Sequence, residues 1–111
     1  MTTLLKALVQ SKFAEAAETI QYTSKDCTTT LDKMTATNVT VLNAVISVSL
    51  VKSGESAGTP NRITFNKSIA PGVSYNFQEI SGHVLEAGDF VSCLAGTASA
   101  LVIKISGRQF T

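Results

Sequence analysis

The segment Val45-Ile46-Ser47-Val48-Ser49-Leu50-Val51 decides the fold, because apolar and hydroxyl-bearing side chains alternate along it. Ile46, Val48 and Leu50 share one face, and the two serines share the other. This period of two is that of a β-strand with one buried face. We therefore predict a central strand here, with its three apolar side chains in the core.

The same period recurs near the end of the sequence. Apolar side chains alternate there with a second set, as Leu101, Ile103 and Ile105 against Val102, Lys104 and Ser106. A sheet with one apolar face must bury that face against a second layer. We therefore expect the apolar faces of the two segments to lie together between two sheets.

A hairpin is predicted between these two segments. Two apolar sets flank the turn Ala70-Pro71-Gly72, namely Ile63, Phe65 and Ile69 before it and Val73, Tyr75 and Phe77 after it. Proline fixes its own φ and glycine accepts a positive φ, which suits both residues to a tight turn.

Further β-prone segments are separated by turn signals. The segments are Ile20 to Ser24, Thr28 to Ala36 and Phe90 to Ala95, and the turns are Lys25-Asp26, Glu86 to Asp89 and Gly96 to Ser99. The total is about seven or eight short strands without a long helical pattern. This predicts an all-β fold: a single antiparallel β-sandwich, immunoglobulin-like or jelly-roll-like.

The beginning of the chain differs from the predicted strands. We divide the sequence into an N-terminal arm, residues 1–18, and a β-sandwich domain, residues 19–111. Residues 13–19 favour a short helix by composition, whereas their neighbours favour extended chain, and both readings stay open. The arm either packs on a neighbouring subunit or closes its own sheet. Its apolar side chains are the candidate partner-binding residues: Leu4, Leu5, Leu8, Val9 and Phe13.

Charge is scarce in this chain. Charged residues make up 15% of the 111 residues, against roughly 25% in typical soluble domains, and the formal net charge is +1. The charges are scattered, which disfavours nucleic-acid binding because phosphate neutralisation needs a cationic cluster. No stretch approaches the roughly 20 apolar residues of a membrane span, and we expect no signal peptide. A neutral surface of this kind suggests coverage by partner subunits.

Residues that could carry chemistry are few. His83 is the only histidine, and no nucleophile forms a recognised motif with it. Cys27 and Cys93 have a separation that resembles the bridge of immunoglobulin domains, but we favour free thiols because no Trp is present to pack on such a bridge. One histidine and two cysteines do not complete a zinc site. We expect no enzyme activity, no metal and no cofactor.

The acids near predicted turns offer a weak alternative. They are Asp26, Asp32, Glu86 and Asp89. Two of them meeting in space could act as a general acid and base. Aspartate is also a turn residue for backbone reasons, and we favour that reading.

Several ordered segments resemble a family of small structural proteins from tailed bacteriophages and prophages, which are encoded among head, neck and tail genes. The segments are Tyr22-Thr23-Ser24, Asp32-Lys33, Thr35-Ala36-Thr37-Asn38, Leu50-Val51, Ser68 to Gly72, Val84 to Asp89 and Ile105-Ser106-Gly107-Arg108. They are turns and strand edges, and the resemblance extends from about residue 13 to the end. It carries over no catalytic or ligand residue.

The resemblance implies a β-sandwich subunit present in several copies on the virion and assembled in the bacterial host cytoplasm. A neck or collar position is expected first, with capsid decoration or a tail position as alternatives. Its partners would be portal or connector, capsid or tail subunits, together with its own copies. The rival function from another class is a carbohydrate-binding sandwich module, which needs aromatic stacking platforms. Aromatic residues make up only 6% of this chain.

Overall fold

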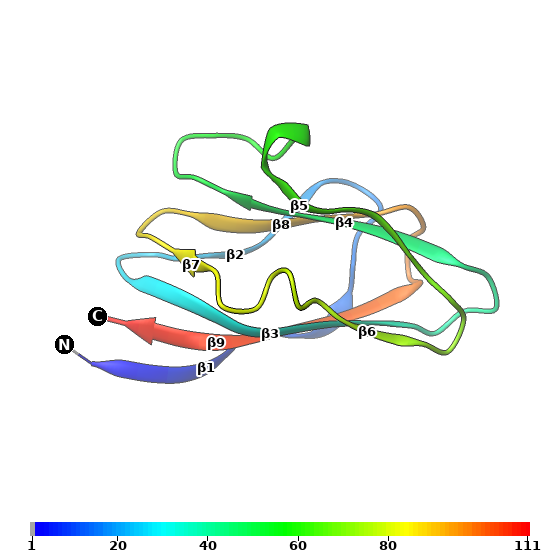
Figure 1. Ribbon diagram of the computed structural model, residues 1–111, viewed down its shortest axis with the longest axis horizontal. Coiled ribbons are helices and arrows are strands. Elements are labelled where there is room, and N and C mark those ends of the chain that lie inside the picture. Colours follow the sequence, from blue (N-terminus) through cyan, green and yellow to red (C-terminus); the bar gives the residue numbers. More distant parts are fainter. Residues whose placement is uncertain (1) are drawn as a thin grey trace.

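Two antiparallel sheets packed face to face make up the molecule (Figure 1). The structure is a computed structural model that describes residues 2–111. It measures 46 × 26 × 19 Å along its principal axes. The predicted antiparallel β-sandwich is therefore confirmed.

The first sheet has the strand order β1-β9-β3-β6, and a short strand, β7, also pairs with β3. Its strands are β1 (Thr3–Phe13), β3 (Thr28–Asn38), β6 (Ser74–Asn76), β7 (Val84–Leu85) and β9 (Leu101–Phe110). The strand β9 is central, since it pairs with β1 on one side and with β3 on the other.

The second sheet has the order β2-β8-β4-β5. Its strands are β2 (Thr19–Thr23), β4 (Ala44–Val51), β5 (Arg62–Ile69) and β8 (Phe90–Ala95). A short 3₁₀ helix, η1 (Thr59–Asn61), precedes β5. Among residues 2–111, no helix is long and apolar enough to cross a membrane.

The core lies between the sheets where the alternation predicted it. Ile46 and Val48 of β4 are fully buried, as are Leu101, Ile103 and Ile105 of β9. Leu50, the remaining predicted core residue, is half-buried and packs against this cluster. The two decisive segments thus lie in opposite sheets and face each other.

The serines of β4 are more buried than a solvent-facing strand face would allow. Ser47 is 2% exposed and Ser49 is fully buried. Asn66 donates its backbone N–H to Ser47 Oγ at 2.9 Å, and Arg62 donates to Ser49 Oγ at 2.8 Å. Side chains from β5 therefore cover this face, and hydrogen bonds offset the burial of the hydroxyls.

The predicted hairpin is wrong. The turn at Ala70 to Gly72 exists, but it leads from β5 in one sheet to β6 in the other. The proposed apolar face of β5 is also wrong, because Asn66 has a φ of 49° and the pairing with β4 shifts between Val48 and Ile46. As a result Ile69 is buried while Phe65 is 65% exposed.

The N-terminal segment closes its own sheet, which is one of the two alternatives considered. The strand β1 pairs with β9 from Thr3 opposite Phe110 to Phe13 opposite Val102. Thr2 and Thr111 extend this ladder by exchanging backbone hydrogen bonds at 2.8 and 2.9 Å. Residues 14–18 form a non-helical connection to β2, so the helical reading of residues 13–19 is also wrong.

Candidate interaction surface

The five apolar residues predicted to bind a partner fall into two groups, one packed in the core and one exposed. Val9 is 5% exposed and Leu8 packs against the core, so both serve the chain's own fold. Leu4, Leu5 and Phe13 are 51%, 75% and 46% exposed. These three form the available apolar surface of β1.

A second apolar surface lies at the end of the sandwich away from the termini (Figure 1). We call it the loop end, and it comprises residues 39–43, 70–73 and 96–100. Val41 is 89% exposed, the highest value among the large apolar side chains of the described residues, and Leu42 is 74% exposed. Val39 and Val73 at the same end are about half exposed, at 55% and 46%.

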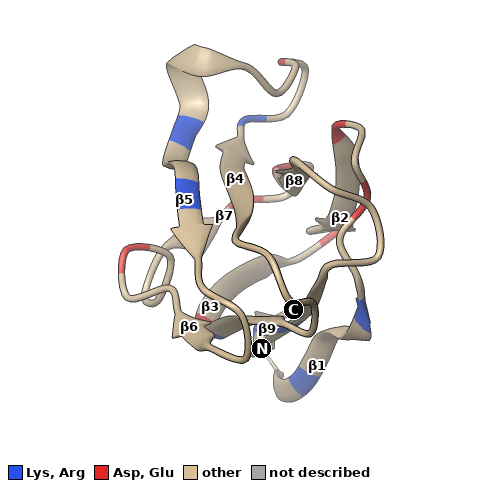
Figure 2. Cartoon of the chain, turned by 90° about the vertical axis from the view of Figure 1, so that its right-hand side faces the viewer, with Lys and Arg blue, Asp and Glu red and all other residues tan. Residues whose placement is uncertain are grey.

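The loop end carries no charge. Its three segments contain no Lys, Arg, Asp or Glu. Figure 2 looks onto this end, and the charged positions lie on the strands and loops around it. An uncharged surface with protruding aliphatic side chains resembles the core of a protein interface, where charged residues are depleted.

The side chain of Asn38 holds the loop end together. Asn38 is fully buried, and its Nδ2 donates to the carbonyl oxygens of Leu42 and Ile69. Its Oδ1 accepts from the backbone N–H of Thr40 at 2.9 Å and from the Thr40 hydroxyl at 2.7 Å. The apolar loop is thus ordered by a buried amide with all its main hydrogen-bonding capacity used.

Backbone hydrogen bonds next to the ends of β3 and β9 also fasten this loop. The backbone N–H of Val39 donates to the carbonyl of Ala100 at 3.0 Å, and that of Gly72 donates to Asn38 at 2.9 Å. Beside the protruding side chains lies a small cleft of about 180 Å³. Its walls are mostly apolar and come from residues 40–44 with Thr97 and Ala100.

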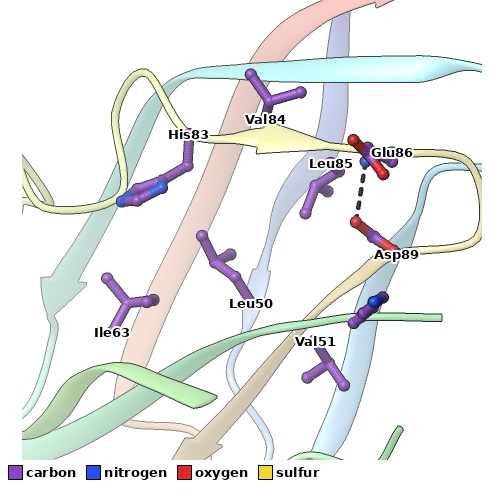
Figure 3. Close-up of a pocket in the computed structure, with 9 residues that line it drawn as sticks. Leu50, Val51, Ile63, His83, Val84, Leu85, Glu86 and Asp89 are labelled. Carbon is purple, nitrogen blue, oxygen red and sulfur yellow. Dashed lines mark hydrogen bonds between the residues drawn. The ribbon is translucent and has the colours of Figure 1, made fainter. Parts of the chain in front are cut away.

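A larger cleft of about 330 Å³ lies where β4 and β5 face the segment 83–86. Figure 3 shows Leu50 and Ile63 on one wall and His83 and Leu85 on the other. The histidine is exposed. The described residues that line this cleft with His83 include no Ser, Thr or Cys.

Asp89 at the rim of this cleft has a structural role. Its Oδ1 accepts from the backbone N–H of Ser53 at 2.9 Å, and its Oδ2 accepts from the backbone N–H of Glu86 at 3.0 Å (Figure 3). The carboxylate therefore joins the turn at 86–89 to the loop after β4. This is the turn role expected of Asp89.

Asp26 and Glu86 also lie at turns as expected, whereas the turn interpretation is wrong for Asp32, which lies within β3. Asp26 lies in a turn with a φ of 56°, and Asp32 pairs with Arg108 across β3 and β9 at 3.1 Å. Glu86 is exposed at a turn. Within residues 2–111, no three His, Cys, Asp or Glu side chains gather as a metal site would require.

A polar cluster covers the outer face of the second sheet. Arg62 donates to Glu18 Oε1 at 2.6 Å, and Ser92 donates to Glu18 Oε2 at 2.6 Å. The hydrogen bond from Arg62, aided by Ser92 and opposed by burial, lowers the pKa of Glu18. The same contact raises the pKa of Arg62. Both shifts favour the charged pair. This pair holds the segment that precedes β2 against β5.

A second carboxylate closes the edge between β5 and β6. Glu79 accepts from Thr64 at 2.5 Å and from the Tyr75 hydroxyl at 2.9 Å. Burial pushes the pKa of Glu79 upward, but these hydrogen bonds and one from the backbone outweigh it and lower that pKa. Lys67 lies 4.7 Å from the centre of the Tyr75 ring. This side of the sandwich is therefore sealed by polar contacts.

Both cysteines are buried and carry free thiols. Cys27 lies among hydroxyl groups, with Ser24 donating to its carbonyl oxygen at 2.7 Å. Cys93 is fully buried in β8, and burial raises the pKa of its thiol to about 12. A thiol in this environment is a poor nucleophile, because the thiolate is the reactive form.

The loop end was not predicted from the sequence. Its signal is the run Val39-Thr40-Val41-Leu42, which places apolar side chains in a connection between strands, where polar turn residues are usual. Its exposure depends on where β3 ends and β4 begins, and the alternation did not fix those boundaries.

No protein-family model matches the chain, and searches of curated proteins and of solved structures found no match.

Proposed function

We propose that this chain is a non-enzymatic structural subunit of a tailed bacteriophage virion, placed at the neck or collar, where it binds other virion proteins. The resemblance of its turns and strand edges to small phage structural proteins supports the virion assignment. The observation that carries the binding role is the exposure of large apolar side chains on an ordered sheet framework, with Leu5 at 75% and Leu42 at 74%.

The exposed part of β1 is the surface we assign to other virion proteins. Leu4, Leu5 and Phe13 lie on an edge strand that eight pairs of residues tie to β9, so they are held in place before binding. Burying each on a neighbour contributes roughly 1.5–3 kcal/mol. Several such anchors, repeated over the copies in a ring, suffice for stable attachment.

Point substitutions test this surface better than a truncation does. Removing residues 1–12 would delete most of β1, including the buried Val9, and would expose the edge of β9. Leu5→Ser removes an exposed anchor and leaves the strand in place. Ile20→Ser is the matched control, because Ile20 is 56% exposed on the edge strand of the other sheet.

The position on the particle is tested with gold-labelled antibodies against the full-length protein, applied to particles from the strain that carries the gene. Label at the junction of head and tail supports the neck or collar assignment. Label over the capsid or along the tail overturns that position in favour of decoration or a tail role. Incorporation should fall with Leu5→Ser and stay unchanged with Ile20→Ser, and equal incorporation of both variants would contradict the role of β1.

A further inference from the structure

We propose that two copies of this chain bind each other end to end through the loop end, in a symmetric contact about a two-fold axis. The four aliphatic side chains Val39, Val41, Leu42 and Val73 are exposed there by between 46% and 89%. This inference goes beyond the proposed function, since it concerns contacts between copies and holds wherever the protein is located.

Charge favours the loop end over the edge strands β1 and β5 as the surface for a second copy. In a two-fold contact each surface meets itself, so a charged group at its centre meets a like charge. The edge strand β1 carries Lys6 and Lys12, and the edge strand β5 carries Arg62 and Lys67. The loop end has no charged residue and therefore pairs with itself without repulsion.

The loop end carries both protruding side chains and a cleft. Val41 and Leu42 protrude beside a mostly apolar cleft of about 180 Å³ that includes Thr97 and Ala100. A two-fold axis presents the protruding side chains of each copy to the cleft of the other. The same patch thus supplies both halves of the contact, as an isologous interface requires.

The loop is already ordered for binding. Asn38 makes four hydrogen bonds that hold residues 40–42 and the carbonyl of Ile69. Ordering a flexible loop on association weakens binding, and a loop held in this way avoids that cost.

The size of the loop end limits the area of the contact. The molecule measures 26 × 19 Å across its long axis, so an end-on contact falls at the low end of specific interface areas. We therefore expect a weak, reversible dimer. Where many copies are held close together, the same contact is reinforced by its high local concentration.

Sedimentation of the full-length protein over a range of concentrations tests the pairing. The wild-type chain should pass from monomer to dimer, and Leu42→Ser should weaken the dimer by at least about tenfold without lowering the melting temperature. Ile20→Ser is the matched control, since Ile20 is an exposed aliphatic side chain, at 56%, on the edge strand β2 and outside the loop end. Its dimer should be unchanged.

Disulfide trapping provides a second readout. Oxidised Val41→Cys should give a covalent dimer at concentrations where the Ile20→Cys variant stays monomeric, because the two native thiols are buried. A wild-type chain that stays monomeric, a dimer that Leu42→Ser leaves intact, or an assembly larger than a dimer would overturn the proposal. None of these outcomes bears on whether antibodies label the particle.

Discussion

The side-chain amide of Asn38 donates a 2.7 Å hydrogen bond to the carbonyl oxygen of Leu42, and through it a buried polar group controls the most exposed apolar loop of the molecule. The same nitrogen donates to Ile69 at 2.8 Å. The loop after β3 and the end of β5 are therefore fastened at one point.

Replacement of this amide should destabilise the whole fold. In Asn38→Ala the buried carbonyl of Ile69 loses its side-chain donor, and the loop loses its attachment at Leu42 and Thr40. We expect the free energy of unfolding to fall by about 2–3 kcal/mol, measured by urea denaturation. Asn43→Ala, at an exposed neighbouring position, should change it little. Equal effects of the two variants would show that the amide bonds do not hold the loop.

Truncation of the facing core residues should be costly. Ile46 of β4 and Ile103 of β9 are both fully buried. Ile46→Ala and Ile103→Ala should each lower the free energy of unfolding by about 2–5 kcal/mol, since each removes apolar contacts and leaves a cavity. Ile20→Ala deletes the same atoms at a position that is 56% exposed, and should cost much less. Similar losses at all three positions would contradict the placement of the core.

Gly107 is a site where any side chain should be harmful. A Cβ there would collide with the backbone oxygen of Thr30 and with Leu8 Cδ1. Gly107→Ala should therefore destabilise the contact of β9 with its neighbours by on the order of 1–3 kcal/mol in thermal or urea unfolding. Gly58→Ala is the control, because its nearest neighbour would be Pro60 Cδ at 3.7 Å. If Gly107→Ala is as stable as Gly58→Ala, the close approach of these strands is wrong.

Acid should weaken the contact between Glu18 and Arg62. The pKa of Glu18 is lowered in the folded chain from its ordinary value of 4.5. The charged carboxylate therefore stabilises the fold fully above about pH 4.5, and this contribution is lost as the pH falls through the folded-state pKa. The difference in unfolding free energy between the wild type and Glu18→Gln should shrink from pH 7 to pH 3. Glu55→Gln, at an exposed carboxylate, should show no such change, and a constant difference for Glu18→Gln would disprove the coupling.

The alternating segments allowed the core to be predicted from sequence, whereas the strand connections could not be. The period of two in Val45 to Val51 identified the buried face of β4 because the pairing of this strand with β8 has no register shift. In β5 the positive φ of Asn66 reverses the facing of later residues, and no glycine marks the position. In β1 two register shifts relative to β9 obscure the alternation, and for this reason the sequence predicts an arm instead of a strand there.

The interaction surface was predicted only in part for a related reason. Leu4, Leu5 and Phe13 stand out in the sequence as apolar side chains without an evident place in the core, and they are exposed. The exposure of Val41 and Leu42 depends on Asn38, whose bond to Ile69 spans 31 positions in the chain. A contact of that range leaves no local pattern.

The most direct test of the central claim is quantitative mass spectrometry of particles purified by density gradient in about 1 M salt. Apolar anchors are not weakened by salt, whereas exposed ion pairs contribute at most about 1 kcal/mol each and are screened. We predict that the protein stays with the particles at a fixed ratio to the capsid subunit, and that it is missing from particles made without its gene. Its absence from wild-type particles in low salt would contradict the virion assignment, and its loss only in high salt would contradict attachment through apolar side chains.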